Sequence, residues 1–186
     1  MRLPALGLLP LVVALAAAWA PHAWAGKAHE HGVARADIGV EAGRITLSLE
    51  LPLEDLAGFE RAPRTDAERA AVTAALAKLQ DVDKLVRIEG AAGCGPAKVQ
   101  LVAPAWGVGG IAPAGAAPAK EAKEVHSDLE ASYEFRCSAS DKARHMELRL
   151  FTAFPRLKRV EVQAVIARGQ MKVVLRRPNE RVSLAR

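Results

Sequence analysis

Apolar and polar residues alternate along two neighbouring segments near the start of the chain. Residues 33–40 and 44–51 are both predicted to be β-strands, and the second alternates strictly. Its apolar positions are Ile45, Leu47, Leu49 and Leu51. Because only Glu41-Ala42-Gly43 separates the two segments, we expect them to form a β-hairpin. Pro52 is expected to end the second strand.

A helix is predicted to follow this hairpin. Thr65 and Glu68 have the spacing of a capping box, in which the side chain of each residue binds the backbone N–H of the other. Apolar residues then recur at helical spacing and mark one face of the helix. They are Val72, Leu76 and Leu79. A shorter helical turn is expected over residues 82–86.

Five more strands are predicted further along the chain. They cover residues 97–102, residues 128–136, and the alternating sets Met146/Leu148/Leu150, Val160/Val162/Ala164/Ile166 and Met171/Val173/Leu175. An Ala/Gly/Pro-rich stretch between the first two predicts a flexible loop over residues 103–124. The fold class is therefore α+β, a mostly antiparallel β-sheet with one main helix packed on it.

Residues 1–25 have the pattern of an export signal. Arg2 precedes an apolar run from Leu11 to Ala20, and Ala23-Trp24-Ala25 has the A-x-A form of a cleavage site. An uncleaved anchor is the alternative, although the run is short for a membrane span. We expect cleavage to leave residues 26–186 as a single periplasmic domain that does not span a membrane.

The net charge of +5 over 186 residues first suggests nucleic acid as a partner. An exported protein rarely meets DNA, so we do not expect nucleic-acid binding. The positive charge is concentrated in residues 156–186, which contain nine basic and two acidic residues. This C-terminal part predicts a surface that favours an acidic partner or an anionic envelope surface.

Cys94 and Cys137 both lie outside the predicted signal. An even number of cysteines in an oxidising compartment indicates a disulfide. A thiolate metal ligand or a nucleophile is the alternative. Neither cysteine belongs to a C-x-x-C pair or lies near a histidine in the sequence, which favours the disulfide.

Three histidines occur in contexts typical of metal ligands. His29 and His31 are two residues apart, and side chains at this spacing in an extended segment point the same way. His126 and Asp128 repeat the spacing, with a carboxylate in second place. Together the four side chains offer three nitrogens and one oxygen, a ligand set suited to Zn²⁺. Surface histidines without a metal are the alternative.

The sequence contains no pattern typical of an enzyme active site. The motifs G-x-S-x-G, H-E-x-x-H and Ser-x-x-Lys are all absent. Glu54 and Asp55 form an acidic pair in the turn expected after Pro52, where we expect them to be solvated. We therefore expect no enzymatic activity.

Several segments of the chain are similar, in the same order, to segments of a known protein family. They are residues 29–37, 51–60, 62–72, 91–94, 126–137 and 150–155, followed by Gly169-Gln170. In this order they resemble the zinc-regulated periplasmic ZrgA-like proteins of Gram-negative bacteria. The resemblance implies a small zinc-binding protein of zinc homeostasis, which delivers zinc to, or cooperates with, an ABC-type zinc importer.

The resemblance also assigns roles to residues. It implies that His29, His31, His126 and Asp128 are associated with the metal, and it matches Cys94 and Cys137 to the family's paired cysteines. Gly58-Phe59-Glu60 is similar to a G-F-E turn to which we give a structural role.

The chain departs from the family at two places. Residues 103–124 contain no histidine, although many members carry a tract rich in His, Asp and Glu there. Arg61 stands where members often have His. These departures favour a discrete site over high-capacity binding. The alternative function is a metal-free periplasmic protein–protein interaction module that uses the basic C-terminal surface.

Overall fold

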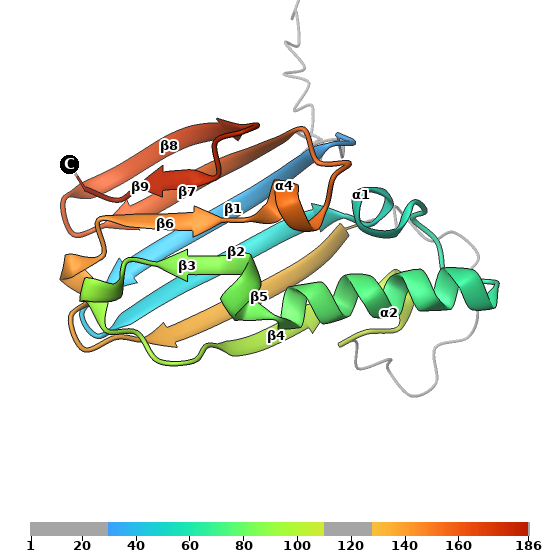
Figure 1. The fold of residues 1–186 in the computed structure, drawn as a ribbon, viewed down its shortest axis with the longest axis horizontal. Coiled ribbons are helices and arrows are strands. Elements are labelled where there is room, and N and C mark those ends of the chain that lie inside the picture. The colour runs from blue at the N-terminus through green and yellow to red at the C-terminus, as the bar shows by residue number, and fades with distance from the viewer. Residues whose placement is uncertain (1–29, 110–127, 186) are drawn as a thin grey trace, which may run out of the picture.

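The computed structural model of the chain describes residues 30–109 and 128–185. The predicted export signal, His29, His126 and most of the predicted loop lie outside the described residues. Two β-sheets and four α-helices make up the described part (Figure 1). Among the described residues, no helix combines the length and apolar character needed to cross a membrane.

The larger sheet has six strands in the order β4-β5-β2-β1-β7-β8. Their bounds are β1 (Val33–Glu41), β2 (Arg44–Pro52), β4 (Lys98–Val102), β5 (Asp128–Arg136), β7 (Arg159–Ile166) and β8 (Gly169–Arg176). The smaller sheet has the order β3-β6-β9. Its strands are β3 (Val86–Ile88), β6 (His145–Leu148) and β9 (Arg181–Ser183). The helices are α1 (Leu53–Ala57), α2 (Asp66–Gln80), α3 (Val82–Leu85) and α4 (Leu150–Ala153).

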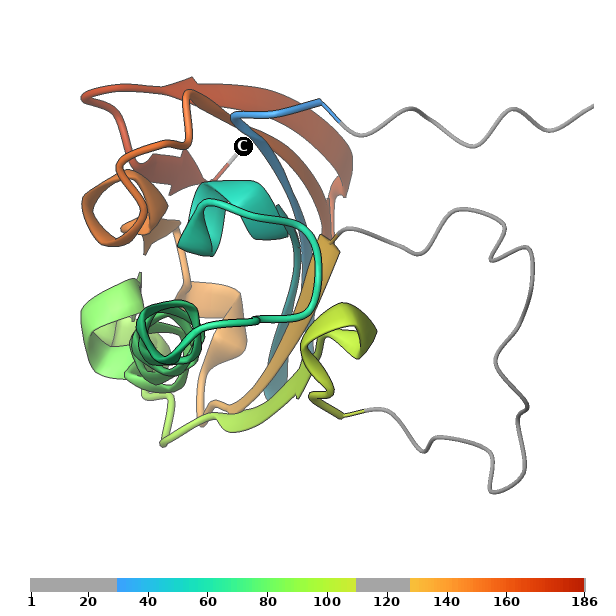
Figure 2. The same ribbon diagram turned by 90° about the vertical axis from the view of Figure 1, so that its right-hand side faces the viewer.

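The helices and the smaller sheet cover one face of the larger sheet (Figure 2). The hydrophobic core lies between these two layers. The predicted apolar face of β2 is fully inside it, with Ile45, Leu47, Leu49 and Leu51 at 0–2% exposure. From α2, Val72 and Leu79 reach the same core. The Tyr133 hydroxyl of β5 donates a hydrogen bond of 2.9 Å to the Leu79 carbonyl, and burial raises the pKa of this phenol.

The predicted α+β class is confirmed. The β1–β2 hairpin is antiparallel, with Arg35 opposite Glu50 and Glu41 opposite Arg44. One pairing within the sheet is parallel, because β1 runs beside β7 in the same direction. The main helix α2 begins with the predicted capping box of Thr65 and Glu68.

Four local expectations are corrected by the structure. The turn predicted over residues 82–86 is helical only to Leu85, and Val86 begins β3. The strand predicted through Leu150 ends at Leu148, because the chain turns into α4. Residues 104–106 of the predicted loop form a 3₁₀ turn that buries Trp106. Helix α1 replaces the turn expected after Pro52.

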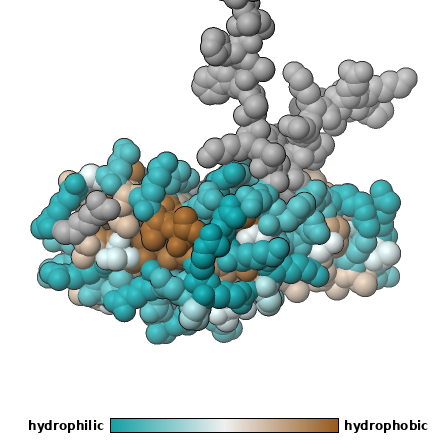
Figure 3. Space-filling view, turned by 90° about the horizontal axis from the view of Figure 1, so that it is seen from above, coloured by the Kyte–Doolittle hydropathy of each residue, from teal (hydrophilic) through white to brown (hydrophobic). Residues whose placement is uncertain are grey.

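Strand β8 is an edge of the larger sheet, paired only with β7 among the described strands. Seen from the β8 side, the surface is mostly hydrophilic, with an apolar area left of centre (Figure 3). Lys172 and Arg176 are exposed along this strand. Cationic side chains on an edge strand disfavour pairing with a further strand, so this edge is poorly suited to sheet extension.

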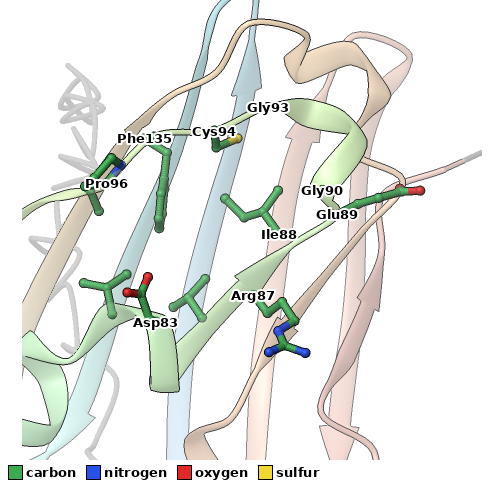
Figure 4. A pocket seen from close by; sticks show the side chains of 13 residues that line it. Asp83, Arg87, Ile88, Glu89, Gly90, Gly93, Cys94, Pro96 and Phe135 are labelled. Atoms are coloured by element: carbon green, nitrogen blue, oxygen red, sulfur yellow. The ribbon is translucent and has the colours of Figure 1, made fainter.

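The predicted disulfide is confirmed. Cys94 Sγ and Cys137 Sγ lie 2.06 Å apart, and Cys137 directly follows β5. Beside Cys94 is a cavity of about 510 Å³, into which Ile88 and Phe135 project (Figure 4). A disulfide is typical of proteins that fold outside the cytoplasm.

Candidate metal site

The candidate site lies at the end of the larger sheet where β1 starts and β2 ends. The antiparallel register places Arg35 opposite Glu50, so the residues before β1 lie beside those that follow β2. His31 precedes β1, and Glu54 belongs to α1, which follows β2 directly. Pairing of the hairpin therefore brings His31 next to α1.

A tight turn fixes the position of His31. The Val33 N–H donates to the Glu30 carbonyl at 3.1 Å, and Gly32 has a positive φ of +80°. The Gly32 N–H donates to Oδ2 of Asp55 at 2.6 Å. The Gly32 carbonyl accepts from the backbone N–H of Lys158 at 2.8 Å. Both polar groups of Gly32 are thus tied to other segments, which fixes the direction of its neighbour His31.

An ion pair secures the other side of this turn. Both carboxylate oxygens of Glu30 accept from the Arg159 guanidinium, at 2.9 and 2.6 Å. This hydrogen-bonded pair lowers the pKa of Glu30. Glu30 is therefore engaged with β7, while His31 is left to face α1.

Two carboxylates approach the same imidazole nitrogen. His31 Nδ1 lies 2.9 Å from Glu54 Oε2 and 3.7 Å from Glu60 Oε1. The three ligand atoms all lie within 4.8 Å of one another. Ligand atoms around a tetrahedral zinc ion are about 3.4 Å apart, from bonds of about 2.0–2.1 Å. The two distances from Nδ1 lie on either side of this value, so His31, Glu54 and Glu60 form a group that could hold a divalent cation.

The turn after α1 carries Glu60. Gly58 ends α1 with φ at +93°, and its N–H donates to the Glu54 carbonyl at 2.8 Å. The Phe59 ring then packs against Trp106, with ring centroids 6.1 Å apart. Because Phe59 is anchored in this way, the adjacent Glu60 is directed to the side on which His31 lies.

Arg61 secures the end of the same turn. Its guanidinium donates two hydrogen bonds to Glu68, at 3.0 and 2.6 Å, and lies 5.4 Å from the Phe59 ring centroid. Glu68 also accepts from the backbone N–H of Arg64 and Thr65. These hydrogen bonds lower the pKa of Glu68 to about 2, and the bond from Arg61 has the largest effect. Arg61 thus joins the turn to the start of α2.

The three side chains are exposed enough to exchange a metal with solvent or a partner. Their exposed fractions are 59% for His31, 48% for Glu54 and 40% for Glu60. One nitrogen and two carboxylate oxygens leave a fourth position of a tetrahedral ion open. Such a site suits capture and release better than permanent structural binding.

Of the ligand set predicted from the sequence, the structure describes His31 and Asp128. His31 is in the cluster, whereas Asp128 is buried at the start of β5, level with Pro52, and lies outside this cluster. Because His29 and His126 fall outside the described residues, their role stays a prediction. Glu54 and Glu60 were not predicted as ligands.

The expectation that Glu54 and Asp55 are both solvated is wrong for Asp55. Its side chain is buried and accepts the Gly32 N–H. The signal for the site was present in the sequence segment 51–60, which contains Glu54 and Glu60 and carries part of the family resemblance. We interpreted its G-F-E turn as structural, and the structure adds Glu60 as a candidate ligand.

A comparison with protein-family models identifies the relatives of this chain. The model of the ZrgA family zinc uptake proteins matches residues 28–184. The chain belongs to this family. The ZrgA match includes His31, Glu54 and Glu60, and confirms the resemblance seen in the sequence. A search of the curated proteins found no match.

Asp55 offers a test of how the site is held. We expect Asp55→Ala to lower the free energy of unfolding by about 2 kcal/mol, because the buried Gly32 N–H loses a charged acceptor. Zinc affinity should fall about tenfold, as is typical when a group supporting a ligand is removed. Urea denaturation and competition with a zinc-binding dye measure the two effects.

Asp55→Asn is the matched control, since an amide oxygen still accepts from Gly32. It should lose clearly less stability and less zinc affinity than Asp55→Ala. Equal zinc affinity in wild type and Asp55→Ala would show that the turn holds His31 without Asp55.

Proposed function

We propose that this protein binds Zn²⁺ through His31, Glu54 and Glu60 and serves zinc acquisition in the periplasm. The observation that supports this most directly is the convergence of the three ligands from separate segments, in a member of a zinc uptake family. An imidazole with two carboxylates is a ligand set that zinc accepts.

The periplasmic location is supported by two features. Residues 1–25 have the pattern of a cleavable signal. The Cys94–Cys137 disulfide suits an oxidising compartment. In that compartment the protein would deliver its zinc to an ABC-type importer or cooperate with one, as the role of its family in zinc uptake suggests.

The proposed mechanism is equilibrium capture without chemical turnover. Neutral imidazole and ionised carboxylates bind the ion, and protons compete for the same atoms. Because all three ligands are exposed, an acceptor protein can approach the ion while it is still bound. Transfer would then follow by exchange of ligands one at a time.

Zinc titration by calorimetry at two pH values tests the proposal. We expect one ion per protein at pH 7.5 and an affinity at least tenfold lower at pH 5.5, because histidine protonates in this range. A matched titration with Mg²⁺ serves as control and should show much weaker binding, since Mg²⁺ favours oxygen ligands. Equal zinc affinity at both pH values would remove histidine ligation from the proposal.

A further inference from the structure

A cavity of about 660 Å³ lies directly beside the candidate metal site. Two of the candidate ligands, His31 and Glu54, line it together with Gly32 and Asp55. The rest of the lining comes from residues 155–158, which connect α4 to β7, and from Arg176 and Arg177 at the end of β8, and we call this part the basic wall. The metal site and a basic wall therefore share one cavity.

Two cations of this wall pack against the turns that carry the metal ligands. A Cβ atom on Gly32 would lie 3.0 Å from the side chain of Lys158, and one on Gly58 would lie 3.1 Å from the Arg156 guanidinium. Nη1 of Arg156 also lies 3.5 Å from the Glu54 carbonyl oxygen. Lys158 thus lies beside Gly32, which follows His31, and Arg156 lies beside Gly58 and the backbone of Glu54.

The wall is held in place by Arg177. Its guanidinium donates to the carbonyls of Pro155 at 2.7 Å and Leu157 at 3.1 Å, and lies 5.3 Å from the Phe151 ring centroid. These contacts tie the end of β8 to the segment that bears Arg156 and Lys158. The basic wall is therefore present before any ligand arrives.

The charges of the cavity favour an anion. Arg156, Lys158, Arg176 and Arg177 contribute four positive charges, against the carboxylates of Glu54 and Asp55. The Asp55 carboxylate is already engaged with the Gly32 N–H. Guanidinium groups bind carboxylates through paired hydrogen bonds. A cavity of this volume also admits a molecule larger than a single inorganic ion.

We propose that this cavity binds a small di- or tricarboxylate next to the metal. His31, Glu54 and Glu60 would hold the ion, to which one carboxylate of the ligand would bind, while another contacts the cations of the basic wall. The contact with the metal rests on the proposed zinc function, whereas the contact with the basic wall does not. Zinc and the carboxylate then raise each other's affinity by the same factor.

Calorimetric titration of the metal-free protein with succinate tests the basic wall alone. Wild type should bind succinate, and Arg156→Gln/Lys158→Gln should bind it at least tenfold more weakly. Arg87→Gln/Lys172→Gln is the matched control, because it removes the same charge from exposed positions outside the cavity, and it should bind like wild type. Zinc-loaded wild type should bind succinate at least threefold more tightly than the metal-free protein.

Each contrary result has its own meaning. Absence of succinate binding to metal-free wild type, or equal binding by the Arg156/Lys158 variant, would overturn the anion site. Binding that zinc does not strengthen would overturn the contact with the metal. Sulfate binding as tightly as succinate, or a hexaglutamate peptide binding more tightly, would overturn the assignment to a small polycarboxylate.

The zinc proposal is tested separately, by zinc titration of the same variants without carboxylate. Arg156→Gln/Lys158→Gln should bind zinc at least as tightly as wild type, because it removes positive charge beside the ion. If wild type does not bind zinc, the proposed function is refuted. The anion site is then judged only by the succinate titration of the metal-free protein.

Discussion

Replacement of His31 by alanine is expected to weaken zinc binding by at least about a hundredfold, more than the loss of a residue that only supports a ligand. His31 contributes the only nitrogen of the described cluster, and its Nδ1 lies 2.9 Å from Glu54 Oε2 and 3.7 Å from Glu60 Oε1. Without it, two exposed carboxylates remain, which favour harder cations such as Mg²⁺ or Ca²⁺. Competition with a zinc-binding dye at pH 7.5 measures the loss.

The remaining ligands are identified by a second set of variants. Glu54→Gln/Glu60→Gln should lose zinc affinity to a similar extent, whereas Glu130→Gln, an exposed position on β5, should not change it. His126→Ala and Asp128→Asn separate the cluster from the ligand set suggested by the sequence. If these two variants lose zinc and Glu54→Gln/Glu60→Gln keeps it, the cluster is not the binding site.

The elements that the sequence predicted best are those with a local signal. Strand β2 could be predicted because four leucine and isoleucine positions alternate over its length, and all four are buried. The start of α2 could be predicted because Thr65 and Glu68 bind each other's backbone. In both cases the decisive interaction involves residues of one short segment, so its pattern is visible in the sequence.

The elements that were missed depend on distant contacts. The parallel pairing of β1 with β7 joins Val33 to Arg159, and no local pattern indicates it. Helix α1 spans only Leu53–Ala57, which is too short for an apolar period to be recognised. Its C-terminal boundary depends on Gly58, which adopts a left-handed conformation.

The candidate site could be predicted only in part, because it also depends on contacts between distant segments. His31 was selected by its residue type and by its spacing from His29. Glu54 and Glu60 meet it only because the hairpin places α1 beside His31 and because Phe59 packs on Trp106. Acidic residues are common on protein surfaces, so their type alone does not distinguish these two.

Removal of the disulfide is expected to have the largest effect on stability. Cys94 and Cys137 are 43 residues apart in the sequence, and closing a loop of this size contributes about 4 kcal/mol in the chain-entropy model. We therefore expect Cys94→Ala/Cys137→Ala to lower the free energy of unfolding by about 2–4 kcal/mol. Urea denaturation of wild type and variant measures this loss. Urea denaturation of wild type under reducing conditions should show a loss of similar size.

The same variant should leave zinc affinity unchanged as long as the protein is folded. Pro52, next to the site, is level with Asp128 at the start of β5, whereas Cys137 follows the other end of that strand at Arg136. Eight steps along a strand span about 27 Å, so the disulfide and the metal cluster lie at opposite ends of the sheet. A fall in zinc affinity of more than about threefold in the folded variant would contradict the expectation that the two sites are independent. It would show instead that loss of the disulfide changes the larger sheet enough to move His31.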